Sequence, residues 1–132
     1  MSFVLHPRLE ADTVFIADWP LCRVLLMNDA RYPWLILAPR RDAVTEWMDL
    51  AVSDQALLAE EIAKAGRAVR GLPGVTKINI GALGNLVPQL HVHVLGRHGG
   101  DPAWPGPVWG HSPAVPYEAA PRDGLIGLVR SL

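Results

Sequence analysis

Three features of the sequence predict an α+β domain with one antiparallel sheet and a long helix covering it. Five short apolar runs, bounded by turn residues, have the length and composition of β-strands. One longer segment, ending near Arg70, carries apolar residues at helical spacing. The chain has 132 residues, which suits a single domain with an ordinary core. An antiparallel sheet covered by one helix is the simplest architecture for these elements.

The first three strands are expected at Thr13–Ala17, Cys22–Met27 and Trp34–Ala38. The four residues of Asp18–Leu21 separate the first two strands, which is a common length for a β-hairpin loop. Pro39 ends the third strand, because proline has no N–H to donate to a sheet.

A short helix is expected at Thr45–Leu50, and a longer one begins at Ser53 or Asp54 and runs to about Arg70. Gly71 follows the long helix as its C-terminal stop. The apolar positions at helical spacing are Leu58, Ile62, Ala65 and Val69.

The last two strands are expected at Thr76–Ile80 and Gln89–Leu95. Gly99–Pro121 is rich in Pro and Gly but also contains Trp104, Trp109 and Tyr117, so we expect an irregular arm that packs on its own subunit or on a neighbour's. Arg122–Leu132 is predicted to end in a short helix. Residues 1–132 therefore form one domain, with its core at about 10–97 and its C-terminal arm at 98–132.

The fifth predicted strand alternates strictly between polar and apolar residues. Leu90, Val92 and Val94 fall on one face, which we expect to be the core face. Gln89, His91 and His93 fall on the opposite face, roughly 6–7 Å apart along the strand. Two imidazoles and an amide on one rigid element suit binding and attack at a phosphate.

The stretch Gln89–Arg97, QLHVHVLGR, resembles the histidine triad (HIT) motif His-φ-His-φ-His-φ-φ, with Gln in place of the first His. The resemblance extends to Met27-Asn28, Trp34–Arg40 and Gly84-Asn85, and covers about residues 10–110. It implies the HIT fold and a homodimer with a continuous sheet. That fold is an antiparallel sheet of about five strands, with one long covering helix and a short second one.

The resemblance also implies an enzyme that hydrolyses or transfers nucleotidyl groups at the α-phosphate of a nucleoside polyphosphate, such as a dinucleoside polyphosphate. By the resemblance, His91 is the nucleophile that forms a covalent nucleotidyl-histidine. A carbonyl accepting from Nδ1–H would leave Nε2 of His91 free to attack. His93 is placed to bond a phosphate or bridging oxygen. No cofactor is required, although a divalent metal could accompany the nucleotide substrate.

Two positions depart from the family pattern. Gln89, counted here among the catalytic residues, can donate to a phosphate oxygen but cannot transfer a proton. This favours a substrate with a good leaving group, such as a polyphosphate, over a phosphoramidate. Trp34 stands where many members carry a histidine that supports the nucleophile's surroundings.

The expected nucleotide- and phosphate-binding residues are Asn28, Asn79, Gly84, Asn85 and Arg97. Glycines before the histidines permit a backbone nest for an anion, and the arginine would complement phosphate charge. Asn85 resembles a phosphate contact of the family, and Asn28 resembles its ribose contact.

Two other functions stay open. The first, which Gln89 and Trp34 favour, is a nucleotide-binding module without efficient turnover. Alternatively, His91 and His93 resemble a pair of metal ligands that His98 or Asp101 could complete, although no Glu or Cys stands nearby at ligand spacing. We expect no metal site.

Composition excludes several partners. A net charge of −1 and a pI near 6.5 argue against a nucleic-acid surface. No apolar run approaches the ~18–20 residues that span a bilayer, and the N-terminus lacks the pattern of a signal peptide. The lone Cys22 fits a reducing compartment. We expect a cytoplasmic protein whose partner is a small nucleotide, without nucleic acid or membrane.

Overall fold

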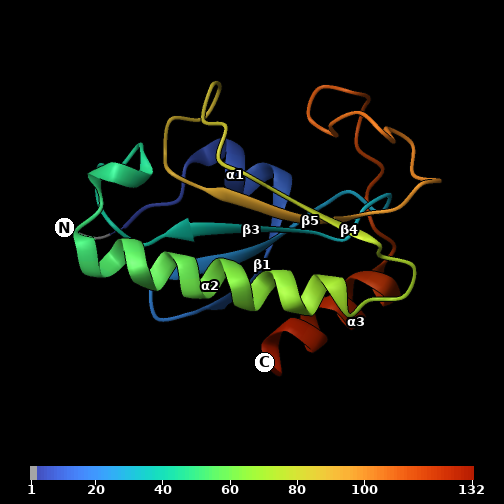
Figure 1. Cartoon of the computed structure of the whole chain (residues 1–132), viewed down its shortest axis with the longest axis horizontal. Coiled ribbons are helices and arrows are strands. Elements are labelled where there is room, and N and C mark those ends of the chain that lie inside the picture. The colour runs from blue at the N-terminus through green and yellow to red at the C-terminus, as the bar shows by residue number, and fades with distance from the viewer. Residues whose placement is uncertain (1–2) are drawn as a thin grey trace.

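The structure is a computed structural model, and it describes residues 3–132. Along the chain run α1 (Pro7–Asp12), β1 (Thr13–Asp18), β2 (Cys22–Met27), β3 (Trp34–Pro39), a 3₁₀ turn η1 (Trp47–Asp49), α2 (Val52–Arg70), β4 (Lys77–Gly81), β5 (Val92–Arg97) and α3 (Ala119–Arg130) (Figure 1). The strands form one five-stranded sheet in the order β1-β2-β3-β5-β4, with every neighbouring pair antiparallel. The predicted α+β class is confirmed.

The largest difference from the predicted elements is α1, which the sequence patterns did not indicate. Its six residues are too few to show helical periodicity. Pro7 begins the helix, and the Nδ1 atom of His6 accepts a hydrogen bond from the N–H of Arg8. Proline is favourable at the first helical position, because an N–H at that position would have no partner within the helix.

Other predicted bounds also differ from those of the structure. The short helix expected at Thr45–Leu50 is the single turn η1, and α3 begins at Ala119 rather than at Arg122. Strand β5 begins at Val92 rather than at Gln89. The backbone before it leaves the sheet because the N–H of Leu90 bonds to the carbonyl of Val44 instead of a neighbouring strand.

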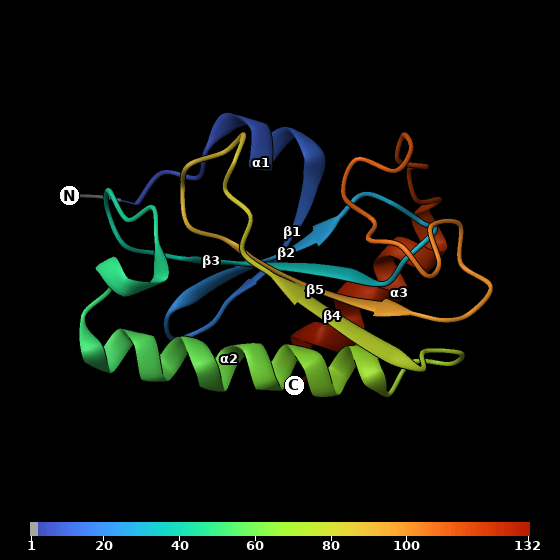
Figure 2. The ribbon, with the colours of Figure 1, turned by 45° about the horizontal axis from the view of Figure 1, so that its top comes forward.

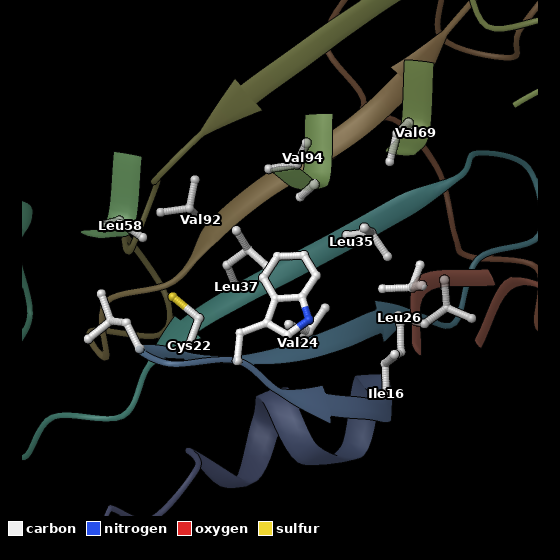
Figure 3. Packing of buried hydrophobic residues seen from close by; sticks show 14 of the residues in the cluster. Ile16, Cys22, Val24, Leu26, Leu35, Leu37, Leu58, Val69, Val92 and Val94 are labelled. Carbon is white, nitrogen blue, oxygen red and sulfur yellow. The ribbon is translucent and has the colours of Figure 1, made fainter. Parts of the chain in front are cut away.

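Helices α2 and α3 cover one face of the sheet (Figures 1 and 2). Side chains from β2, β3 and β5 meet Leu58 and Val69 of α2 there (Figure 3). Leu90, Val92 and Val94 are all in this cluster, which confirms the predicted core face. Cys22 is fully buried in the same cluster.

The opposite face of the sheet is covered by α1 and by the arm of residues 98–118 (Figure 2). All six residues of β5 are consequently buried. The alternation in the sequence did not show that the histidine face of this strand would be covered as well. The unpredicted helix and the folded-back arm cover it.

The arm packs on its own chain. The N–H of Ala30 bonds to the carbonyl of Val115, and the N–H of Tyr117 bonds to the side-chain oxygen of Asn28. Of the three aromatic residues, Trp104 stays 40% exposed. The sequence left open whether the arm packs on its own subunit or on a neighbour's, and these contacts are within the subunit. Within residues 3–132, the structure contains no helix with the length and apolar character needed to cross a membrane.

Candidate active site

The two histidines of the predicted motif lie at one cavity of about 570 Å³ on the face covered by α1 and the arm. Its walls come from α1, the end of β2, β3, the loop before β5 and the arm. In Figure 2, α1, this loop and the arm stand on the same side of the sheet. The polar lining residues are Arg8, Asp12, Asp29, Arg31, Asn85, His91, His93 and Ser112. The large apolar ones are Leu9, Met27, Trp34, Ile36, Leu83, Leu86, Val87, Val108 and Trp109.

His91 has its proton on Nδ1. That nitrogen lies 2.7 Å from the backbone oxygen of Gln89, and a carbonyl oxygen can only accept a hydrogen bond. Nε2 therefore carries the free lone pair. Burial lowers the pKa of His91, and the bond to the carbonyl of Gln89 opposes this only in part. The imidazole is neutral at pH 7, and the Gln89 carbonyl makes the contact required of a nucleophilic tautomer.

His93 has the opposite tautomer. The indole N–H of Trp34 donates to its Nδ1 across 3.0 Å, and an indole nitrogen can only donate. The proton of His93 is therefore on Nε2. Burial, with a smaller contribution from His91, lowers the pKa of His93 to about 3. The ring lies edge-on to Trp109, 5.5 Å between centroids, which shields it from solvent.

Gln89 does not line the cavity. Its side-chain oxygen accepts from the N–H of His6 at 2.8 Å, and its side-chain nitrogen donates to the carbonyl of Val4 at 2.9 Å. The side-chain amide of Gln89 was expected to contact a phosphate, but in the structure it bonds to the N-terminal segment. The side chain ties down the segment that leads into α1, while the backbone carbonyl orients His91.

The other predicted binding residues divide into two groups. Gly84 and Asn85 line the cavity, and Gly84 has φ +69°, a conformation that favours glycine. Asn28, Asn79 and Arg97 lie outside it.

The reason is that these three side chains are used to hold the arm and the sheet. The guanidinium of Arg97, 2% exposed, donates to both carboxylate oxygens of Asp101, to Asn79 and to the carbonyl of Gly106. Asn28 accepts from the arm. The buried guanidinium of Arg97 thus satisfies its donors within the protein. The phosphate and ribose contacts of these three residues stay predictions.

Sequence reasoning missed several charged residues of the cavity. Arg31 bonds to both carboxylate oxygens of Asp29 and to the hydroxyl of Ser112 in the arm. Burial would raise the pKa of Asp29, but the bonds from Arg31 hold it below the ordinary value. Both residues lie in the short segment after β2, close to Asn28, and that proximity was the available signal. Arg8 and Asp12 were missed together with α1.

The alternative of a metal site has no third ligand among residues 3–132, where no three His, Cys, Asp or Glu side chains gather closely enough to hold an ion. Asp101 is already bonded by Arg97. Nδ1 of His98 accepts from the N–H of Gly100.

The fold and the site together define a small α+β domain with two neutral histidines of opposite tautomer at one cavity. The HIT domain family matches residues 8–100. No curated protein matches the chain. A histidine triad protein from Bradyrhizobium japonicum is 46% identical with a TM-score of 0.96, covering 99% of this chain and 98% of that one. One from Marinobacter aquaeolei VT8 is 44% identical with a TM-score of 0.95, covering 99% and 96%.

The chain belongs to the HIT domain family, whose members are nucleotide-binding hydrolases and transferases. The NitFhit protein of C. elegans is 20% identical, with a TM-score of 0.65 over 92% of this chain and 27% of that one, and shares the fold.

Proposed function

We propose that this protein is a nucleotide hydrolase or nucleotidyl transferase that cleaves a nucleoside polyphosphate at its α-phosphate, with His91 as the covalent nucleophile. One observation carries the proposal. His91 has a free lone pair on Nε2, whereas His93, with its ring centroid 5.0 Å away, has an N–H on Nε2. A nucleophile and a hydrogen-bond donor for the reacting phosphate thus lie side by side.

The chemistry follows in two steps. Nε2 of His91 attacks the α-phosphorus, an N–P bond forms, and the bridging P–O bond breaks so that the distal phosphate leaves as an anion. The imidazole becomes cationic, and the carbonyl of Gln89 stabilises that charge through Nδ1–H. In the second step, water or another acceptor attacks phosphorus and the N–P bond breaks, which restores His91. The histidine carries the intermediate, so this mechanism needs no cofactor; a divalent metal with the nucleotide stays part of the proposal.

The remaining walls of the cavity suit the rest of such a substrate. Apolar side chains from α1, β3 and the arm would pack against a base, as small-molecule sites commonly do. Gly84 and Asn85 would contact phosphate oxygens. Arg31 supplies positive charge, balanced in the free protein by Asp29.

Replacement of the nucleophile tests this function. His91→Ala should lower turnover of a dinucleoside polyphosphate by at least about a thousandfold, because a covalent route is lost. His98→Ala is the matched control, since His98 is exposed and outside the cavity, and it should retain wild-type turnover. Near wild-type activity in a folded His91→Ala protein would rule the mechanism out.

A nucleotide-binding module without efficient turnover is the second candidate, and Trp34 at the position of a family histidine favours it. Calorimetric binding of the dinucleotide with no product formed would support that candidate. The expected homodimer, which rests on the resemblance, also stays a proposal, and light scattering measures it.

A further inference from the structure

Trp34 lies next to His93 because of strand register. Trp34 pairs with Leu95 across the β3–β5 ladder, and this puts it diagonal to His93 on the same face of the sheet. The two rings are 5.7 Å apart between centroids. Trp34 is 5% exposed, and the rings of Tyr32 and Trp109 lie edge-on to it. The indole is therefore held in place, and its single polar group, the N–H, donates to Nδ1 of His93.

An indole donor limits what His93 can do. A neutral imidazole that gives up its Nε2 proton needs a proton at Nδ1 in exchange, or it becomes an anion. Trp34 has no such proton to give, since its N–H is a donor that does not ionise in the pH range of proteins. The cation of His93 would also set an N–H at Nδ1 against the N–H of the indole.

We propose that Trp34 is a positioning residue that holds His93 as a fixed Nε2–H hydrogen-bond donor and prevents it from protonating a leaving group. This inference rests on the function proposed above and narrows its substrates. The site would then take anhydrides, whose phosphate leaving groups depart as stable anions. Phosphoramidates, whose amine has to be protonated as the P–N bond breaks, would be poor substrates.

The aromatic rings next to His93 are those of Trp34, Trp109 and His91, and the last of these is the nucleophile. Among residues 3–132, the one side chain that forms a hydrogen bond with the His93 ring is Trp34. Gln89, the family's first triad position, points to the N-terminal segment. The charged groups that face the same cavity are Arg8 and Asp12 from α1, with Asp29 and Arg31 from the segment after β2. The lowered pKa of His93 agrees with a ring that stays neutral.

The ring nitrogens of His93 test the inference without any substrate. In ¹⁵N-labelled protein, long-range ¹H–¹⁵N spectra should show His93 protonated on Nε2, with a hydrogen-bonded Nδ1, unchanged from pH 5 to pH 8. In Trp34→Phe, Nδ1 should lose its donor and shift, while His91 keeps its own pattern as an internal control. A wild-type His93 that carries a proton on Nδ1, or that titrates within this range, would overturn the inference, and this measurement stands even if both Trp34 variants fail to fold.

Substrate preference supplies the second readout. The ratio of kcat/KM for a nucleoside phosphoramidate to that for a dinucleoside polyphosphate is measured in wild type, Trp34→His and Trp34→Phe. Trp34→His should raise the ratio at least about tenfold near pH 5.5, because a second imidazole can relay a proton to His93. Trp34→Phe should not raise it, because phenylalanine, like tryptophan, has no proton to give to Nδ1 of His93. An unchanged ratio in a folded Trp34→His protein would contradict the inference, whereas activity retained in His91→Ala would overturn the proposed function and leave the tautomer of His93 as measured.

Discussion

The two faces of β5 are equally buried but chemically different. One face presents Val92, Val94 and Gly96 to the helices, whereas the other presents His93 and Arg97 toward α1 and the arm. Each polar group on the second face has its own partner: the indole of Trp34 for the histidine and the carboxylate of Asp101 for the arginine. The helix-covered face is specified by shape, and the site face by pairing of donors with acceptors.

Gly96 shows how closely shape is specified on the helix-covered face. A Cβ at this position would lie 2.8 Å from Cγ2 of Val75, 2.9 Å from Cγ of Pro33 and 3.0 Å from Cγ1 of Val69. One residue further along the strand, the opposite face holds the whole guanidinium of Arg97, which donates four hydrogen bonds. The helix-covered face of β5 therefore has no room for a methyl group at Gly96, whereas the site face holds the charged side chain of Arg97.

The largest stability effect is expected where a charge partner is removed. Asp101→Asn should lower the free energy of unfolding by about 3–5 kcal/mol, since it leaves the buried guanidinium of Arg97 without its counter-charge. Asp123→Asn is the control, because its pair with Arg122 is exposed. Urea denaturation of both variants measures the difference. Equal stabilities would mean that pairing does not specify the site face.

A smaller loss is expected from a small change of shape. Gly96→Ala should cost roughly 1–3 kcal/mol, because its methyl group overlaps the side chains of Val69, Val75 and Pro33. Gly66→Ala adds the same methyl group within α2, where nothing lies within 4 Å, and should be neutral or stabilising. Thermal unfolding of the two variants compares them. A Gly96→Ala protein as stable as wild type would show that this packing yields easily.

The smallest effect concerns pH. The folded pKa of His93 is about 3, below the ordinary value of about 6.5 for an unfolded chain, so the unfolded state binds the proton first as the pH falls. The stability contributed by the neutral histidine is complete above pH 6.5 and is lost below it. Between pH 7 and pH 5.5 the loss should be roughly 1 kcal/mol.

The variant His93→Gln isolates this contribution, because glutamine does not titrate and its side-chain oxygen can still accept from Trp34. Urea denaturation at both pH values should show a smaller loss of stability in the variant than in wild type. The same pH dependence in both proteins would mean that His93 is not the group that binds the proton on unfolding.

Sequence by itself determined what local periodicity encodes. Alternation placed His91 and His93 on one face and Leu90, Val92 and Val94 on the other, and helical spacing with Gly71 ended α2 at Arg70 as predicted. These features depend on neighbours a few residues away, so a single sequence contains them.

Only the tertiary structure decided which polar groups meet. The partner of Gln89 lies 83 residues away at His6, Trp34 bonds a histidine 59 residues away, and Asn28 is used by an arm 89 residues further on. Periodicity shows which side a residue faces, but it cannot show what covers that side. Arg97, Asn28 and Asn79 were expected at the nucleotide for that reason. Their hydrogen-bond partners lie in segments whose positions only the folded chain establishes.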